Sequence, residues 1–237
     1  MFSSHAVVFD FDGTLMPKEF ISLFNVMDCA LGEVHRKEIE NLRIKYIPKI
    51  LSRQITPEED MIMVTRPAQI YIESRLTICQ MKKAIAKVNL RQGVTKTLQF
   101  LYEQKIPVAI ISYSYLQAIE LTLTKHGIGH LVSKVYGANL VFKNGIVCGY
   151  RPETFVFSKN KGLFSRQFAK RYDIPDKNIL AVGDSGADCY LGHLKENRLG
   201  LAQDEAEKEK IQKFFGEVVV TENFDPVLEW LKMKINP

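Results

Sequence analysis

Two aspartates, Asp10 and Asp12, stand two residues apart where a short apolar run meets Gly13. In an extended strand, residues i and i+2 point to the same face, so both carboxylates could address a single ligand. Gly13 would let the chain turn sharply and bring its amides close to a bound anion. Paired acids at such a turn suit phosphoryl transfer, although aspartate and glycine are also ordinary residues at the end of a strand.

Three later segments also place polar side chains where an expected element ends or begins. An apolar run of buried-strand length ends in a hydroxyl, two lysines precede a helical pattern, and another short apolar run is followed by a glycine and two acids. Each feature alone has an ordinary structural explanation, such as a strand with a loop or a pair of solvated lysines. The residues concerned are Ser112, then Lys159 and Lys161, then Asp184 and Asp188.

In this order and with these strand contexts, the four segments resemble the motifs of the haloacid dehalogenase superfamily of phosphohydrolases. The aspartate pair with glycine and threonine, the strand-terminal serine, the lysine and the final pair of acids match that superfamily's four motifs in turn. The separations from Asp10 to Glu19 and from Lys161 to Asp184 are similar to those of the phosphoserine phosphatase-like branch, and residues 137–149 look like that branch's hairpin.

The resemblance implies a phosphomonoester hydrolase that works through an aspartyl phosphate. Asp10 would be the nucleophile, and Asp12 would act first as general acid and then as general base. Ser112 and the following backbone amide would hold a phosphoryl oxygen, while Lys161 would offset its charge. Lys159 is the alternative lysine, less favoured because the spacing to the last motif fits Lys161.

The resemblance also implies Mg²⁺, because a phosphate dianion repels a carboxylate nucleophile unless a cation neutralises charge. Mg²⁺ prefers oxygen ligands and is commonly held by one or two carboxylates. The implied ligands are the carboxylates of Asp10 and Asp184 and the backbone carbonyl of Asp12. Asp188 would bind through water or orient Asp184.

The elements that must position these residues follow an α/β pattern. Short apolar runs separated mainly by helical patterns predict a Rossmann-like, three-layer core with a parallel sheet. In such sheets, ligands bind beyond the carboxyl ends of the strands, where the strand order reverses. Asn144 and Gly145, between apolar alternations, predict a two-residue hairpin. The runs are residues 6–10, 107–111, 132–136, 179–182, 198–201 and 218–220.

Residues 17–89 lack a convincing strand and carry apolar residues at helical spacing, such as Leu23 and Met27. Thr56, Pro57 and Glu59 match an N-cap, a first-turn proline and a capping-box acid. We therefore expect an all-helical cap domain over 17–89 and a discontinuous core over 1–16 and 90–237. In the superfamily that the chain resembles, such an insert covers the active site; a helical subdomain without a gating role is the alternative.

The substrate side departs from the phosphoserine phosphatase pattern. Tyr113 and Ser114 stand where that branch has two glycines, and Ala187 stands where it has asparagine. The cap arginine that would hold a substrate carboxylate has no clean counterpart, since Arg66 and Arg75 match only by region. Phosphoserine is therefore one candidate substrate rather than the expected one.

By position, Gly13, Glu19 and Tyr113 are expected to contact the substrate, a small phosphorylated metabolite. Glu19 would meet a substrate ammonium in the resembled branch, but a glutamate in the first turn of a helix also complements the helix dipole. One alternative is a phosphatase with an open cap that acts on phosphorylated protein side chains such as phosphotyrosine. Another is a phospho-accepting, receiver-like module without turnover.

Length, composition, cysteine spacing and net charge limit the class of protein further. With 237 residues and 46% hydrophobic content, the chain can build a substantial core. Its four cysteines form no CysXaaXaaCys pair, so neither a zinc site nor a disulfide framework is indicated. The net charge of +5 is mild and interleaved with acids, so no nucleic-acid partner is expected. We expect no membrane span and a cytoplasmic location; the oligomeric state stays open.

Overall fold

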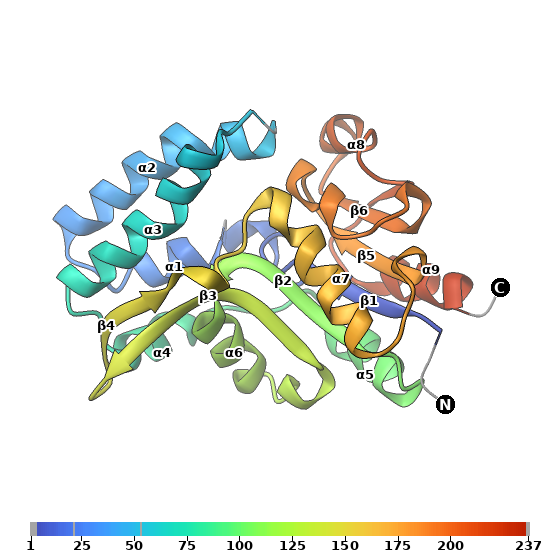
Figure 1. Cartoon of the computed structure of the whole chain (residues 1–237), viewed down its shortest axis with the longest axis horizontal. Coiled ribbons are helices and arrows are strands. Elements are labelled where there is room, and N and C mark those ends of the chain that lie inside the picture. Colours follow the sequence, from blue (N-terminus) through green and yellow to red (C-terminus); the bar gives the residue numbers. More distant parts are fainter. Residues whose placement is uncertain (1–3, 21, 53, 236–237) are drawn as a thin grey trace.

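The computed structural model describes residues 4–20, 22–52 and 54–235, and within them seven strands form one sheet in the order β4-β3-β2-β1-β5-β6-β7 (Figure 1). The β3–β4 pair is antiparallel, and the other pairs in this sheet are parallel. All six apolar runs predicted to be strands lie in it. The strands are β1 (Ala6–Phe9), β2 (Val108–Tyr115), β3 (Lys134–Lys143), β4 (Ile146–Arg151), β5 (Ile179–Gly183), β6 (Arg198–Ala202) and β7 (Glu217–Val220).

The strand order reverses at β1. The chain continues from β1 to β2 and β3 on one side, then returns to place β5 on the other side of β1. The carboxyl ends of β1, β2 and β5 therefore meet at a topological switch point, where open α/β sheets bind ligands. The predicted motifs other than that of Lys161 follow or lie in these three strands.

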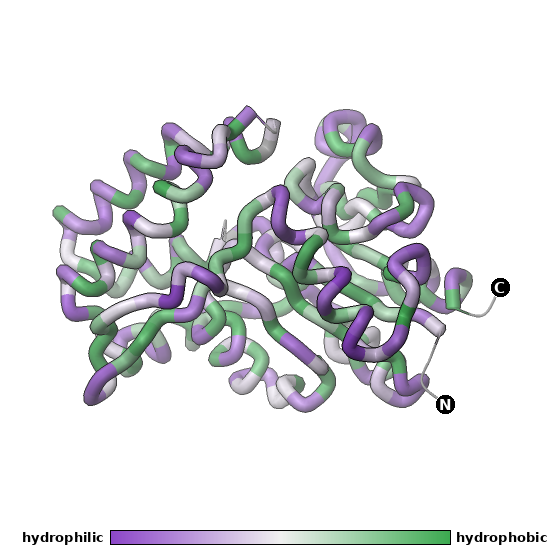
Figure 2. The backbone as a smooth tube through the Cα atoms, viewed as in Figure 1, coloured by the Kyte–Doolittle hydropathy of each residue, from purple (hydrophilic) through white to green (hydrophobic). Residues whose placement is uncertain are grey.

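Helices cover both faces of the sheet, which confirms the three-layer, Rossmann-like core. Val7 and Phe9 pack into the core under one set of helices, whereas Ala6 and Val8 pack toward Phe168 on the other face. Burial on both faces explains why β1 reads as a continuous apolar run, visible as green tube in Figure 2. The first set is α5 (Val94–Glu103), α6 (Leu116–Lys125) and α9 (Asp225–Ile235); the second is α7 (Lys161–Arg171) and α8 (Glu205–Ile211).

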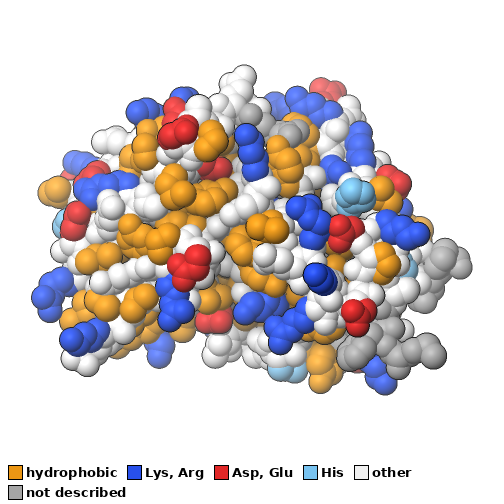
Figure 3. Space-filling view, viewed as in Figure 1, with side chains coloured by type: hydrophobic (Ala, Val, Ile, Leu, Met, Phe, Trp, Pro, Cys, Tyr) orange, Lys and Arg blue, Asp and Glu red, His pale blue; other side chains and the backbone are white. Residues whose placement is uncertain are grey.

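A helical region between β1 and β2 forms the cap. Its helix α3 begins with the predicted capping box, in which Thr56 and Glu59 bond each other's backbone amides, with Pro57 in the first turn. Helices α2 and α3 lie side by side (Figure 1), and hydrophobic side chains gather over them in Figure 3. We keep 17–89 as the proposed limits of the cap. The helices are α1 (Leu23–Asp28), α2 (Glu33–Leu51), α3 (Pro57–Glu73) and α4 (Ile78–Ile85).

Two local predictions have different outcomes. The hairpin between β3 and β4 is confirmed, and Asn144 and Gly145 both have the positive φ that a tight two-residue turn requires. The prediction that the second strand ends at Ser112 is wrong, because β2 continues through Tyr115, which pairs with Ala138 of β3 after an irregularity.

None of the helices described is long and apolar enough to cross a membrane.

Short 3-10 helices connect several elements. Two of these 3-10 helices lie at the motif residues: η4 leads directly into α7, and η6 follows β5. The 3-10 helices are η1 (Lys18–Phe20), η2 (Gly129–Leu131), η3 (Pro152–Thr154), η4 (Ser158–Asn160), η5 (Asp176–Asn178), η6 (Gly186–Tyr190) and η7 (Lys195–Asn197).

Candidate active site

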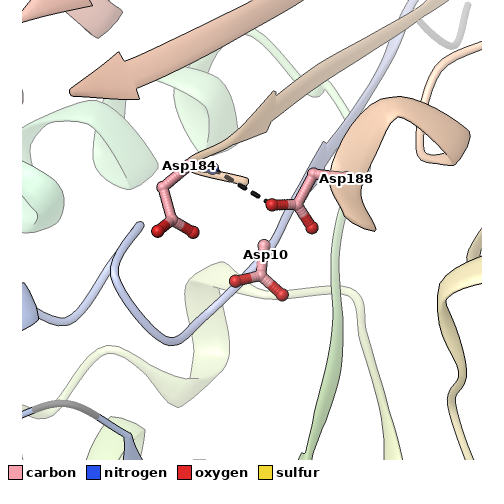
Figure 4. Close-up of side chains that lie close together, drawn as sticks. All are labelled: Asp10, Asp184 and Asp188. Atoms are coloured by element: carbon pink, nitrogen blue, oxygen red, sulfur yellow. Dashed lines mark hydrogen bonds between the residues drawn. The ribbon is translucent and has the colours of Figure 1, made fainter. Parts of the chain in front are cut away.

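Among the described residues, Asp10, Asp184 and Asp188 form a cluster in which one carboxylate oxygen of each lies within 4.8 Å of the others. Asp10 follows β1, Asp184 follows β5, and Asp188 lies on η6. Figure 4 shows the three carboxylates facing one another beyond the strand ends. The structure therefore brings the first and fourth predicted motifs together at the switch point of the sheet.

Lys161, the first residue of α7, supplies a buried cation to this cluster. Its Nζ donates to Asp10 Oδ1 at 2.7 Å and to Asp188 Oδ1 at 2.6 Å, and the residue is 2% exposed. Burial alone would lower the pKa of Lys161, but the two carboxylates outweigh it and raise the pKa above its ordinary value. Lys159, the alternative lysine, is exposed.

Asp188 holds Asp184 in place through the backbone. Its Oδ2 accepts hydrogen bonds from the amide of Asp184 at 3.1 Å, the amide of Ser185 at 3.0 Å and the Ser185 hydroxyl at 2.9 Å. With Oδ1 bound to Lys161, both oxygens already have protein partners. The contacts favour the orienting role for Asp188, whereas a contact to metal through water stays a prediction.

The Asp12 carboxylate is turned away from the acidic cluster, toward the start of the cap and the end of β2. Its Oδ1 accepts from the Leu23 amide at 2.6 Å, and its Oδ2 accepts from the hydroxyls of Ser114 at 2.6 Å and Ser112 at 3.4 Å. Burial raises the pKa of Asp12, and these hydrogen bonds oppose the rise. A carboxyl group with a raised pKa is better able to carry a proton, as a general acid must.

The turn after Asp10 requires glycine at position 13. Gly13 has φ of 77°, and a Cβ there would lie 2.4 Å from Asp184 Oδ2. Arg91 fixes this turn by donating to the Gly13 carbonyl at 2.8 Å. Thr14 donates to Asp184 Oδ1 at 3.3 Å, so the first motif and the fourth are joined directly.

The donor set fits Mg²⁺. Asp10 and Asp184 present hard oxygen ligands at the ends of two neighbouring strands. The Asp12 backbone carbonyl as a further ligand stays a prediction. Crowding of buried carboxylates is costly without a cation. Burial, together with the nearby Asp188, raises the pKa of Asp184 to about 6, although Lys18 opposes this with a contact of 2.9 Å to Asp184 Oδ2.

This pKa predicts a pH-dependent stabilisation by Mg²⁺. Because the folded pKa of Asp184 lies above its unfolded value, its contribution to stability is present at low pH and is lost as pH rises through about 6. Mg²⁺ needs the ionised carboxylate, so the rise in melting temperature on adding Mg²⁺ should be largest above pH 6 and shrink below it. Thermal melting with and without Mg²⁺ across this range measures the effect, and an increase independent of pH would contradict it.

The residues predicted to contact the substrate lie in different places relative to the acidic cluster. Glu19 is exposed on η1, and its contact with substrate stays a prediction. Tyr113 lies beside Ser112, but its hydroxyl points to Asp60 of the cap rather than to the acidic cluster. Arg66 pairs with glutamates of the cap surface, Glu38 and Glu73.

Several residues of the site carry no motif that would have identified them. Lys18 bridges Asp184 and Glu207, and Arg91 holds the Gly13 turn. Each of these contacts joins segments far apart in the sequence, so only the folded arrangement reveals it.

Comparison with known proteins gives the same family as the four motifs. The chain matches the model for haloacid dehalogenase-like hydrolases over residues 7–196. It is 27% identical over 139 residues to a 2-hydroxy-3-keto-5-methylthiopentenyl-1-phosphate phosphatase from Microcystis aeruginosa (strain NIES-843 / IAM M-2473). That alignment spans 58% of this chain and 58% of that protein.

Solved structures of phosphatases share the fold. A phospho-aspartyl intermediate analogue of phosphoserine phosphatase has a TM-score of 0.70 at 18% identity, covering 96% of this chain and 99% of that chain. Cytosolic 5′-nucleotidase IIIB bound to cytidine has a TM-score of 0.77 at 18% identity, covering 98% of this chain and 87% of that chain. A substrate-bound phosphoserine phosphatase has a TM-score of 0.71 at 17% identity, covering 95% of this chain and 97% of that chain. These likenesses confirm the predicted core with its helical cap.

Proposed function

Because the chain belongs to the haloacid dehalogenase-like hydrolase family, we propose that it hydrolyses phosphate monoesters of small metabolites through an aspartyl phosphate on Asp10, with Mg²⁺ as cofactor. One observation carries the proposal: Asp10 is contacted by the buried ammonium of Lys161, while Asp12 is held apart from it by separate hydrogen bonds. The two carboxylates therefore have environments suited to different tasks, one as nucleophile and one as proton carrier.

In the first step, a carboxylate oxygen of Asp10 attacks phosphorus, and the bond from phosphorus to the leaving oxygen breaks. Asp12 gives its proton to that leaving oxygen. Ser112 and the following amide hold a phosphoryl oxygen, and Lys161 offsets the charge that develops. Mg²⁺, held by Asp10, Asp184 and the Asp12 carbonyl, would supply the positive charge that lets an anionic nucleophile approach the phosphate.

In the second step, Asp12 takes a proton from a water molecule, whose oxygen attacks phosphorus and displaces Asp10. Inorganic phosphate leaves, and Asp12 is again protonated for the next cycle. The raised pKa of Asp12, caused by burial, supports this cycle because the side chain must alternate between its protonated and ionised forms.

Asp12→Asn tests the proton transfer. Asparagine can keep the hydrogen bonds to Leu23 and Ser114, so the fold should persist while turnover of an alkyl phosphate falls by about 10²- to 10⁴-fold. With p-nitrophenyl phosphate, whose leaving group needs no proton, the first step should be largely spared and stopped-flow absorbance should show a burst of p-nitrophenol. Equal loss with both substrates and no burst would exclude this role for Asp12.

A small metabolite is the proposed substrate because the cap packs onto the core beside the motifs. Tyr46, Ile50 and Met63 of the cap cluster with Ala187, and Tyr113 packs against them. Closure of this kind would exclude a protein surface, and the apolar lining favours a leaving group that is at least partly apolar. Phosphoserine stays a candidate, with Glu19 as the residue available to its ammonium.

Phosphate release by the purified protein tests the proposal. A panel of phosphometabolites and phosphopeptides, including phosphotyrosine peptides, is assayed with Mg²⁺ and with chelator. We expect Mg²⁺-dependent release from small metabolites. Release confined to phosphopeptides would favour an open-capped protein phosphatase, and a stable phosphoprotein without release would favour a receiver-like module.

A further inference from the structure

We propose that Tyr113 and Asp60 form a positioning pair that couples closure of the cap to the placement of Lys161. The proposal rests on the catalytic role of Lys161 given above. It starts from the residue that departs most clearly from the resembled branch, since a tyrosine follows Ser112 where that branch has glycine. It assigns a task to Asp60, a buried acid of α3 that the mechanism does not use.

The Tyr113 hydroxyl joins three elements. It donates to Asp60 Oδ1 of the cap at 3.0 Å, accepts from the Ser158 amide at 2.6 Å, and lies 2.5 Å from the Ser158 hydroxyl. A tyrosine hydroxyl has one donor and two acceptor positions. With its proton directed to Asp60, both acceptor positions are available to Ser158.

Ser158 begins η4, the turn that presents Lys161. Within this turn, the Lys161 amide donates to the Phe157 carbonyl at 3.1 Å, and the Phe157 amide donates to Asn160 Oδ1 at 2.6 Å. The Lys161 ammonium also lies 5.6 Å from the centre of the Tyr113 ring. Tyr113 thus supports the catalytic lysine twice, through the backbone of the preceding turn and through its ring.

Asp60 brings the cap into this arrangement. It is 6% exposed, and burial raises its pKa while hydrogen bonds from the Tyr113 hydroxyl and the Ser158 amide oppose the rise. If the cap moved away, the Tyr113 hydroxyl would lose the acceptor that fixes the direction of its proton, and the Ser158 amide would lose its hydrogen bond to Asp60. The turn before Lys161 would then be held less firmly.

Packing alone does not explain this carboxylate. The cap already contacts the core through apolar side chains, including Ile50 and Met63 against Ala187. A cavity of about 200 Å³ lies on the seam between cap and core, with Asp60 and Ser158 in its wall. Burying a carboxylate is unfavourable unless it is hydrogen-bonded. The hydrogen bonds that join Asp60, Tyr113 and Ser158 therefore point to a role beyond holding the cap on the core.

The test compares Asp60→Ala, Asp60→Asn, Tyr113→Phe and the double variant Asp60→Ala/Tyr113→Phe, with p-nitrophenyl phosphate and Mg²⁺ as probe. The exposed Glu58 on the same helix gives a matched control, Glu58→Ala. We expect Asp60→Ala and Tyr113→Phe each to lower kcat by about 10- to 100-fold, with a smaller change in KM. The double variant should lose clearly less than the product of the two single losses, because both side chains act on the same turn. Asp60→Asn, whose amide oxygen still accepts, should stay near wild type.

Hydrogen exchange distinguishes this positioning role from one in which Asp60 only holds the cap on the core, since the latter would leave exchange in η4 unchanged. In Asp60→Ala, the amides of residues 158–161 should exchange faster although the substitution lies in the cap. Unchanged kcat and unchanged exchange at 158–161, or fully additive losses in the double variant, would overturn the pairing. Failure of the proposed hydrolysis would appear differently, as an inactive wild-type protein, and the exchange comparison would still decide whether Asp60 acts on the turn.

Discussion

Asp10→Asn protein is expected to fold normally and to release no phosphate above background from any substrate of the wild-type protein. Asparagine keeps the size of the side chain and an oxygen that can accept from Lys161, whereas it cannot form the bond to phosphorus. Loss of a nucleophile of this kind lowers turnover by about 10⁵-fold or more. Phosphate release and thermal melting of the same preparation measure the two expectations.

Asp225→Asn is the matched control, because Asp225 is an exposed aspartate at the start of α9. It should keep wild-type turnover. Near-wild-type activity in Asp10→Asn would refute the covalent mechanism. Loss of folding in Asp10→Asn would instead move the comparison to Asp10→Glu, which keeps the charge beside Lys161 but displaces the nucleophilic oxygen.

Lys161→Met is expected to impair both turnover and folding. It leaves Asp10 and Asp188 buried without their shared cation, and removing one partner of a buried ion pair destabilises a protein by about 3 to 5 kcal/mol. Lys161 also lowers the pKa of Asp10, so without it that pKa should rise further. A raised carboxyl pKa makes the folded state more stable at low pH, so the deficit should be smaller at about pH 5 than at about pH 8.

Lys159→Met provides the comparison, since this lysine is exposed and stands two residues earlier. It should change neither the melting temperature nor turnover substantially. The experiment is urea denaturation of both variants and the wild type at the two pH values. A Lys161→Met protein as stable as Lys159→Met would show that the buried cluster is not held together by this lysine.

The strand ends and their acids could be predicted because local signals define them. The runs before Asp10 and Asp184 are buried on both faces of the sheet, so every position in them is apolar or small. A glycine lies near the end of each strand. The register of a parallel sheet then brings these ends together. Ser112 shows the limit of this reasoning, because pairing with β3 extends β2 beyond the apolar run.

The contacts between cap and core could not be predicted in the same way. Asp60 lies in the first turn of α3, where an acid is explained by the helix dipole alone. Its partner Tyr113 is 53 residues away along the chain, and their meeting depends on how the cap lies on the sheet. Lys18 and its contact with Asp184 depend on the same placement.

The most direct test of the account is to trap the covalent intermediate. Wild-type protein and Asp10→Asn are mixed with substrate and Mg²⁺, quenched during turnover and treated with borohydride, which reduces an acyl phosphate of aspartate to homoserine with loss of phosphate. Peptide mass spectrometry should find homoserine at position 10 in the wild type and no such product in Asp10→Asn. Rapid phosphate release with Asp10 unmodified at every quench time, and with Asp10→Asn equally active, would contradict the central claim.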